Sequence, residues 1–106
     1  MQQLSAKQTQ EYLRTSEPKP TLVDVREPHE IAICAIEGAI NIPLSRFTEA
    51  LNRLDPDKEI VLFCHHGMRS MQAGMFLKGH GYHKLINMQG GINAWASDVD
   101  PQMVRY

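Results

Sequence analysis

Residues Ile60–Ser70 read IVLFCHHGMRS, an apolar run that leads directly into a cysteine, two histidines, a glycine and an arginine. The apolar residues do not alternate with polar ones, which is typical of a strand buried on both faces of a sheet. The residues that follow, Ser70–His80, carry apolar side chains at helical spacing, with Gly79 and Gly81 as stop signals. We therefore expect a buried strand, a reactive loop at Cys64 and a helix, in that order.

Strand and helix signals alternate along the rest of the chain as well. Further strands are predicted at Thr21–Val25, Ala39–Pro43 and Lys84–Met88, and further helices at Ser5–Ser16, after Pro28, from Ser45 and from Ile92. Helices between successive strands are typical of parallel sheets. Each crossover must return the chain to the end of the sheet at which the previous strand began, and a helix usually covers that distance. The sequence predicts an α/β fold: a largely parallel central sheet of four or five strands, flanked by helices on both faces, in one domain over residues 1–106.

Two of the predicted helices carry specific expectations. Ser5 followed by Gln8 resembles a capping box, so the first helix should begin just after Ser5. In the helix from Ser45, Phe47, Leu51 and Leu54 recur at helical spacing. We expect these three side chains to share one buried face, with Ser45 as the residue that caps the helix.

The composition is that of a globular domain without a membrane segment. Hydrophobic residues make up 42% and charged residues 22% of the 106 residues, and no window approaches the run of about 18 apolar residues that a membrane helix needs. The polar N-terminus lacks the pattern of a secretory signal, so a cytoplasmic location is expected. A net charge of -1 with scattered basic residues argues against nucleic acid and membranes as partners.

The predicted position of Cys64 suits a nucleophile. Ligands of α/β proteins bind at the carboxyl ends of the strands, and the first amides of the following helix have no intrahelical partner. Together with the helix dipole these amides favour a negative atom, and Gly67 allows the backbone to curl around it. Arg69 adds a permanent cation, and His65 and His66 can each add a proton near neutrality. Such surroundings lower the pKa of a thiol and favour its thiolate.

Two other interpretations of Cys64 concern structure and metal binding. A cysteine after an apolar strand is often only a small buried residue. A metal site fits the sequence less well, because the adjacent His65 and His66 point in divergent directions and no second cluster supplies further ligands. We therefore expect no metal at this loop.

Four segments taken together resemble a known family. LVDVREPHEI (residues 22–31), IEGAINIP (36–43), CHHGMRS (64–70) and QGGINAW (89–95) are similar, in this order and spacing, to the rhodanese homology domain, specifically to a single-domain sulfurtransferase. The resemblance implies an enzyme like thiosulfate sulfurtransferase, which needs no cofactor. Such an enzyme takes a sulfane sulfur from a small-molecule donor such as thiosulfate, holds it as a cysteine persulfide, and passes it to cyanide or a protein thiol.

The resemblance also implies roles for individual residues. Cys64 is the catalytic residue that would form the persulfide, and Asp24 and Arg26 match a motif expected to support the fold near the site. Gly90–Gly91 and Trp95 match a closing motif for which a structural role is expected. The loop implied to bind the substrate sulfur consists of His65, His66, Gly67, Met68 and Arg69.

Cys34 stands where members of the family often have a glycine. Ile31, Ile33 and Ile36 surround it in the sequence, so we expect an apolar and inert setting for its thiol. On this basis Cys34 is interpreted as a packed residue that does not attack a persulfide on Cys64.

Two other functions stay open beside sulfur transfer. One is a non-catalytic sulfur carrier or protein-interaction module, which only hands its sulfur to a dedicated partner. The other is a phosphatase or arsenate reductase, which uses a similar anion loop between a cysteine and an arginine. Only four residues separate Cys64 from Arg69, one fewer than in the related phosphatases, and this makes the second alternative the weaker one.

Overall fold

The computed structural model describes residues 1–106 and contains one five-stranded sheet in which all neighbouring strands are parallel. The strand that leads to Cys64 lies in the middle of this sheet. This confirms the predicted α/β fold with a largely parallel sheet. In spatial order the strands are β1 (Gln2–Leu4), β5 (Leu85–Met88), β4 (Ile60–Phe63), β2 (Thr21–Asp24) and β3 (Ile40–Asn41).

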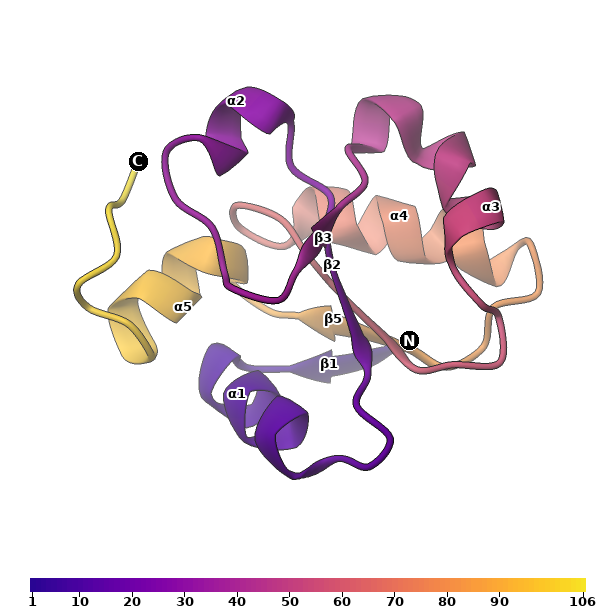
Figure 1. Ribbon diagram of the computed structural model, residues 1–106, viewed down its shortest axis with the longest axis horizontal. Coiled ribbons are helices and arrows are strands. Elements are labelled where there is room, and N and C mark those ends of the chain that lie inside the picture. Colours follow the sequence, from indigo (N-terminus) through magenta and orange to yellow (C-terminus); the bar gives the residue numbers. More distant parts are fainter.

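Helices cover both faces of the sheet, as predicted (Figure 1). On one face α1 (Ala6–Thr15) packs beside α5 (Gly91–Asp98). The other face is covered by the 3-10 helix η1 (Leu44–Glu49), α3 (Ala50–Arg53) and α4 (Met68–Lys78). The short helix α2 (Pro28–Ile31) follows the carboxyl end of β2. None of the helices is long and apolar enough to cross a membrane.

The sequence of β4 accounts for its central position. Side chains of a strand point alternately to the two faces of the sheet. Ile60 and Leu62 accordingly belong to the core beside α3 and α4, whereas Val61 and Phe63 belong to the core beside α1 and α5. All four side chains are buried. The absence of alternation in IVLF therefore reflects burial on both faces, as predicted.

The N-terminal segment combines one confirmed prediction with one missed element. Oγ of Ser5 accepts a hydrogen bond from the Gln8 amide at 3.1 Å, and Oε1 of Gln8 accepts one from the Ser5 amide at 2.9 Å. This capping box begins α1 where it was expected. β1 was not expected, because the polar residues before Ser5 show no strand pattern. It forms by pairing along β5, with Gln3 opposite Asn87.

The helix predicted from Ser45 is not one regular helix. The chain forms η1 and then α3, and Arg46 within η1 has non-helical angles of φ -131° and ψ 35°. Phe47 and Leu54 are buried as predicted, but Leu51 is 37% exposed, so its predicted burial is wrong. Ser45 lies inside η1 and does not cap it. A 3-10 segment has about three residues per turn, so the assumed helical spacing does not hold across the break.

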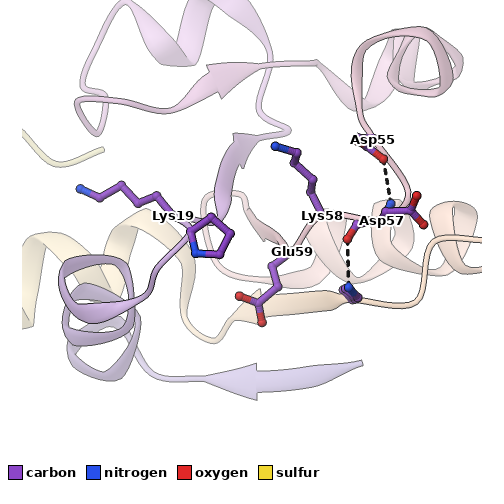
Figure 2. Close-up of a pocket in the computed structure, with 7 residues that line it drawn as sticks. Lys19, Asp55, Asp57, Lys58 and Glu59 are labelled. Atoms are coloured by element: carbon purple, nitrogen blue, oxygen red, sulfur yellow. Dashed lines mark hydrogen bonds between the residues drawn. The ribbon is translucent and has the colours of Figure 1, made fainter.

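A cavity of about 570 Å³ lies at the end of the sheet opposite Cys64 (Figure 2). Its walls come from the residues that precede β2, β4 and β5. They carry lysine and carboxylate groups but no cysteine or histidine, so this cavity offers no thiol or imidazole for nucleophilic chemistry. The lining residues are Pro18, Lys19, Asp55, Asp57, Lys58, Glu59 and Lys84.

Candidate active site

Cys64 lies directly after β4, where the central strand turns toward α4. The residue is 1% exposed. Gly67 precedes α4 with a φ of +113°, a left-handed conformation that is open to glycine and strained for other residues. This turn brings the Gly67 amide to 3.0 Å from the sulfur of Cys64, to which it donates a hydrogen bond. The predicted order of strand, loop and helix is present, although α4 begins at Met68, earlier than expected.

Backbone amides at the start of α5 donate hydrogen bonds to the loop that begins at Cys64. The amide of Ile92 donates to the carbonyl of Cys64 at 2.8 Å, and the amide of Asn93 donates to the carbonyl of His65 at 3.0 Å. A Cβ at Gly91 would lie 2.4 Å from the carbonyl oxygen of Cys64, and real side chains do not approach so closely. The glycine pair of the QGGINAW segment therefore lets α5 pack against the loop backbone, in line with the structural role expected for it.

Hydrogen bonds to the sulfur lower the pKa of the Cys64 thiol. Burial alone raises this pKa, because the charged thiolate loses its hydration. The effect of burial is outweighed by hydrogen bonds from the Ser70 side chain and from the amides of Ser70, Gly67 and His66, which bring the pKa below its usual value. The loop therefore favours the nucleophilic thiolate, the form of cysteine that attacks sulfur.

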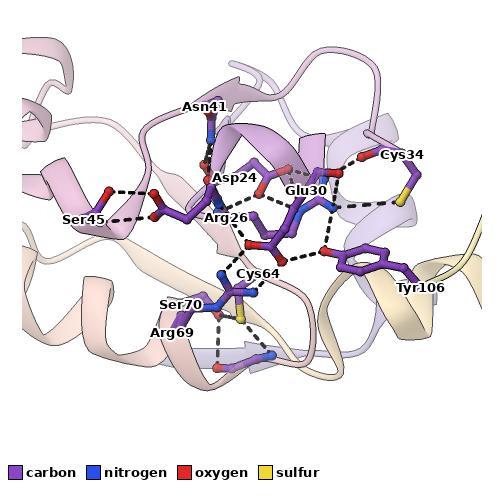
Figure 3. Close-up of polar contacts among 12 residues, drawn as sticks. Asp24, Arg26, Glu30, Cys34, Asn41, Ser45, Cys64, Arg69, Ser70 and Tyr106 are labelled. Carbon is purple, nitrogen blue, oxygen red and sulfur yellow. Dashed lines mark hydrogen bonds and ion pairs between the residues drawn. The ribbon is translucent and has the colours of Figure 1, made fainter. Parts of the chain in front are cut away.

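Ser70 and Asn87 are buried polar residues of the site that the sequence interpretation missed. Oγ of Ser70 lies 3.5 Å from the sulfur of Cys64 (Figure 3) and 2.5 Å from Oδ1 of Asn87. Asn87 in turn donates from Nδ2 to Oε1 of Gln3 at 2.9 Å. The sequence contained a signal for Asn87, since an asparagine inside the apolar strand LINM needs buried polar partners.

Arg69 is paired with a carboxylate and is not a free cation. Its Nη1 and Nη2 donate to the two carboxylate oxygens of Glu30 at 2.6 Å and 2.8 Å (Figure 3). The hydrogen bond from Arg69 is the main cause that lowers the pKa of Glu30 to about 2, with further hydrogen bonds from Tyr106 and the Glu27 amide. Glu30 was not predicted, because 39 residues separate it from Arg69. Its negative charge balances the cation that the sequence placed beside the loop.

Tyr106 joins the same network from the other end of the chain. Its hydroxyl donates to Oε2 of Glu30 at 2.7 Å and accepts from Nη1 of Arg26 at 2.9 Å (Figure 3). Burial, with Glu30 as a further cause, raises the pKa of Tyr106 to about 12. The ring of Tyr106 stacks on that of His65, with centroids 3.8 Å apart and an interplanar angle of 5°. No local pattern in the sequence pointed to this residue.

The imidazole of His65 contacts Tyr106 and not the sulfur of Cys64, and the side chain of His66 faces solvent. Nε2 of His65 donates to the backbone carbonyl of Tyr106 at 2.9 Å, and the His65 and His66 rings are 4.0 Å apart. Burial and the neighbouring His66 lower the pKa of His65, so this imidazole is largely neutral near pH 7. This differs from the expectation that it adds a proton. His66 is exposed, and Met68 is 76% exposed at the start of α4.

Asp24 and Arg26 form a buried ion pair beneath the site. Nη2 of Arg26 lies 2.8 Å from Oδ2 of Asp24, and both side chains are buried. The same nitrogen donates to the carbonyl of Cys34 at 2.8 Å, which ties the segment after α2 to the end of β2. The pair has the supporting position that was expected for it.

The surroundings of Cys34 are less apolar than predicted. Its sulfur lies 3.9 Å from Nη1 of Arg26, and it lines a small cavity together with His65 and Tyr106. Ile36 is buried nearby, but Ile33 is 40% exposed. The prediction of a purely apolar setting is therefore wrong, because Arg26 reaches across from the end of β2.

Comparison with known proteins agrees with this geometry. The chain matches the profile of the rhodanese-like domain over residues 5–98. It is 42% identical over 90 residues to the probable adenylyltransferase/sulfurtransferase MoeZ of Mycobacterium tuberculosis, a match that covers 83% of this chain but only 23% of MoeZ. It is 40% identical over 81 residues to the putative sulfurtransferase YtwF of Bacillus subtilis, covering 76% of this chain and 78% of YtwF.

A solved structure extends the similarity to three dimensions. The crystal structure of a rhodanese-related protein from Thermoplasma volcanium matches with a TM-score of 0.81 and 32% identity, covering 93% of this chain and 94% of that chain. The sequence profile, the named sulfurtransferases and the structural match all point to the same family. This chain belongs to the rhodanese-like domain family.

Proposed function

We propose that this domain is a sulfurtransferase that carries a sulfane sulfur as a persulfide on Cys64. The observation that carries the proposal is the hydrogen bond of 3.0 Å from the Gly67 amide to the sulfur, at the N-terminus of α4. The lowered pKa of Cys64 adds to it, because sulfur attack requires a thiolate.

The reaction divides into two displacements on sulfur. With thiosulfate as donor, the Cys64 thiolate attacks the outer sulfur and forms a new S–S bond. The S–S bond of the donor breaks, and its electron pair leaves with sulfite. A nucleophilic acceptor, cyanide or a protein thiolate, then attacks the outer sulfur of the persulfide. The electron pair of that bond returns to Cys64, which is again a thiolate, so no base and no cofactor is needed.

The loop from His65 to Arg69 would bind the sulfur being transferred. The amides at the start of α4 have no intrahelical partner, and an anionic persulfide sulfur is a suitable acceptor for them. His65, His66 and Met68 would form the walls of the entrance, since their side chains do not contact the Cys64 sulfur. Arg69 would guide an anionic donor only weakly, because Glu30 balances its charge.

The proposal is tested by incubating the protein with thiosulfate, removing the donor, and measuring the intact mass. A gain of one sulfur atom that is absent in Cys64→Ser supports persulfide formation at Cys64. Release of thiocyanate on addition of cyanide then supports an enzyme. Stable sulfur on Cys64 without turnover would favour the sulfur-carrier alternative, and no mass gain would contradict both.

A phosphatase or arsenate reductase remains the weaker alternative. Four residues separate Cys64 from Arg69, and the guanidinium that would hold an oxyanion is engaged by both carboxylate oxygens of Glu30. We expect no hydrolysis of an aryl phosphate. Turnover that is lost in Cys64→Ser would reverse this ranking.

A further inference from the structure

The hydroxyl of Ser70 has more hydrogen-bond acceptors around it than it can serve. Ser70 is fully buried, and its single proton faces the sulfur of Cys64 at 3.5 Å, the carbonyl of Gly67 at 3.1 Å and Oδ1 of Asn87 at 2.5 Å. A serine hydroxyl donates one strong hydrogen bond at a time. The distances assign the proton to Asn87 while the sulfur is uncharged, because 3.5 Å is long for a donor and 2.5 Å is short.

Asn87 is held in this orientation by its other contacts. It is 2% exposed on β5, and its Nδ2 donates to Oε1 of Gln3 on β1 at 2.9 Å. Nε2 of Gln3 is in turn 2.9 Å from the sulfur of Met71 on α4. This chain of contacts places the carbonyl oxygen of Asn87, and not its amide nitrogen, against Ser70.

We propose that Asn87 is a positioning residue that competes with the sulfur of Cys64 for the one hydroxyl proton of Ser70, and so limits how strongly Ser70 stabilises negative charge there. The inference rests on the proposed function of Cys64. When the sulfur of Cys64 becomes a thiolate, its charge makes it the stronger acceptor. Turning the hydroxyl toward the sulfur leaves Oδ1 of Asn87 buried without its donor, which opposes the turn.

The other groups near Cys64 are separate from this competition. The charged side chain in the first turn of α4 is Arg69, which pairs with Glu30 of α2, and the titratable groups of the loop are His65 and His66. Asn87 makes its side-chain hydrogen bonds to Ser70 and Gln3 alone. A substitution at Asn87 can therefore reach Cys64 electrostatically through Ser70 without changing the Arg69–Glu30 pair.

The test is a double-mutant cycle on the pKa of the Cys64 thiol. The pKa is read from the pH dependence of alkylation by iodoacetamide, in a Cys34→Ser background so that one thiol reacts. Asn87→Leu keeps a similar volume and removes the acceptor. We expect it to lower the pKa by roughly half a unit to one unit, the size expected for one strengthened hydrogen bond to a charged atom. Ser70→Ala should raise the pKa, and adding Asn87→Leu to Ser70→Ala should change nothing.

Three outcomes would overturn the proposal. They are an unchanged pKa in Asn87→Leu, a raised pKa in Asn87→Leu, and a lowering that persists in the Ser70→Ala background. If circular dichroism shows that Asn87→Leu does not fold, Asn87→Asp decides the question. Its carboxylate should hold the Ser70 proton more firmly and raise the Cys64 pKa, by less when Ser70 is alanine. An equal rise in both backgrounds would mean that the new carboxylate acts by its charge alone, which would contradict the competition for the Ser70 proton.

The measurement also separates this inference from the proposed function. Alkylation needs no sulfur donor, so the cycle can succeed or fail whether or not Cys64 takes up sulfur. If sulfur transfer is present, Asn87→Leu should also speed the transfer of the outer sulfur to cyanide, because that step returns the charge of a thiolate to Cys64. Slower transfer than in the wild type would contradict the competition at this step.

Discussion

Two regions surround the sulfur of Cys64. In one of them backbone amides face the sulfur, and in the other charged side chains pair with one another. The first, which we call the backbone cradle, consists of the loop Cys64–Gly67 and the first turns of α4 and α5. The second, the charged rim, consists of the side chains of Asp24, Arg26, Glu30, Arg69 and Tyr106 (Figure 3). In the cradle, a backbone amide donates directly to the sulfur. In the rim, each arginine has a carboxylate partner.

The difference shows where the positive character of the site originates. The two charges of each ion pair cancel at distances larger than their separation, so the rim adds little net attraction for an anion. The amides and dipole of α4 have no such counter-charge and act at hydrogen-bond distance. We infer that the cradle stabilises the reacting sulfur, whereas the rim fixes the shape of the entrance. The predictions below test this division, from the largest effect to the smallest.

Cys64→Ser removes the thiol of the cradle that we propose as the nucleophile. Sulfur transfer from thiosulfate to cyanide should fall to background, because a serine hydroxyl is almost un-ionised near neutral pH. The thermal unfolding temperature should stay close to that of the wild type, since the replacement is nearly isosteric. Thiocyanate formation near the wild-type rate would contradict the role of Cys64.

Gly67→Ala distorts the cradle without touching the rim. The left-handed φ of +113° is strained for alanine, and the new Cβ would lie 3.4 Å from the Gly90 amide nitrogen. We expect a loss of about 1–2 kcal/mol in the free energy of unfolding and a clear drop in turnover, measured by denaturant unfolding and a thiocyanate assay.

Gly81→Ala is the matched control. Gly81 has a similar φ of +90°, and nothing lies within 4 Å of a Cβ placed there. This variant should lose similar stability but keep its activity. If both variants lose activity equally, the effect of Gly67→Ala comes from stability and not from the cradle.

Arg69→Ala breaks the rim and leaves the carboxylate of Glu30, a buried residue, without its main partner. We expect a loss of about 1–3 kcal/mol in unfolding free energy at pH 7, with a smaller change in turnover than in Gly67→Ala. Glu30→Gln provides the comparison, because it leaves Arg69 as an unpaired cation. The apparent affinity for thiosulfate at low salt should weaken in Arg69→Ala and strengthen in Glu30→Gln. The same affinity in all three proteins would mean that the rim has no electrostatic effect on the donor.

The Arg69–Glu30 pair also predicts a pH dependence of stability. The pKa of Glu30 is lowered from 4.5 to about 2 in the folded protein, so its contribution is complete above pH 4.5. It is lost as the pH falls toward 2, because protonation then favours the unfolded chain. The stability difference between wild type and Arg69→Ala should therefore narrow over this range in urea unfolding. If the difference in unfolding free energy between the two proteins does not change with pH, the effect of Arg69→Ala comes from packing.

Tyr106→Phe is expected to have the smallest effect. It removes the hydroxyl shared by Arg26 and Glu30 but keeps the ring that stacks on His65. The loss in unfolding free energy should be about 1 kcal/mol, and turnover should change little. Tyr106→Ala should cause a larger loss in unfolding free energy. It should also raise the pKa of His65, measured by NMR titration, because the imidazole becomes more exposed to water when the stacked ring is removed. Equal effects of both variants would mean that the hydroxyl alone matters.

The sequence alone determined the parts of the protein that depend on short-range rules. The burial of IVLF on both faces, the capping box of α1 and the loop between β4 and α4 each follow from neighbouring residues, and all three are present. The position of Cys64 at the N-terminus of a helix could therefore be predicted before any coordinates. The broken helix at Arg46 could not, because the hydrophobic spacing was compatible with either arrangement.

Only the tertiary structure decided which charges and hydrogen bonds meet at the site. In the sequence, Arg69 and its partner Glu30 are 39 residues apart. Glu30 and Tyr106 are 76 residues apart, and Asn87 and Gln3 are 84 residues apart. Such pairs depend on strand order and on how each helix is rotated, which no local periodicity encodes. The sequence could show that Arg69 is a cation beside a thiol. That Glu30 balances its charge follows from the fold, which brings the two side chains to hydrogen-bond distance, because electrostatic effects depend on distances between atoms.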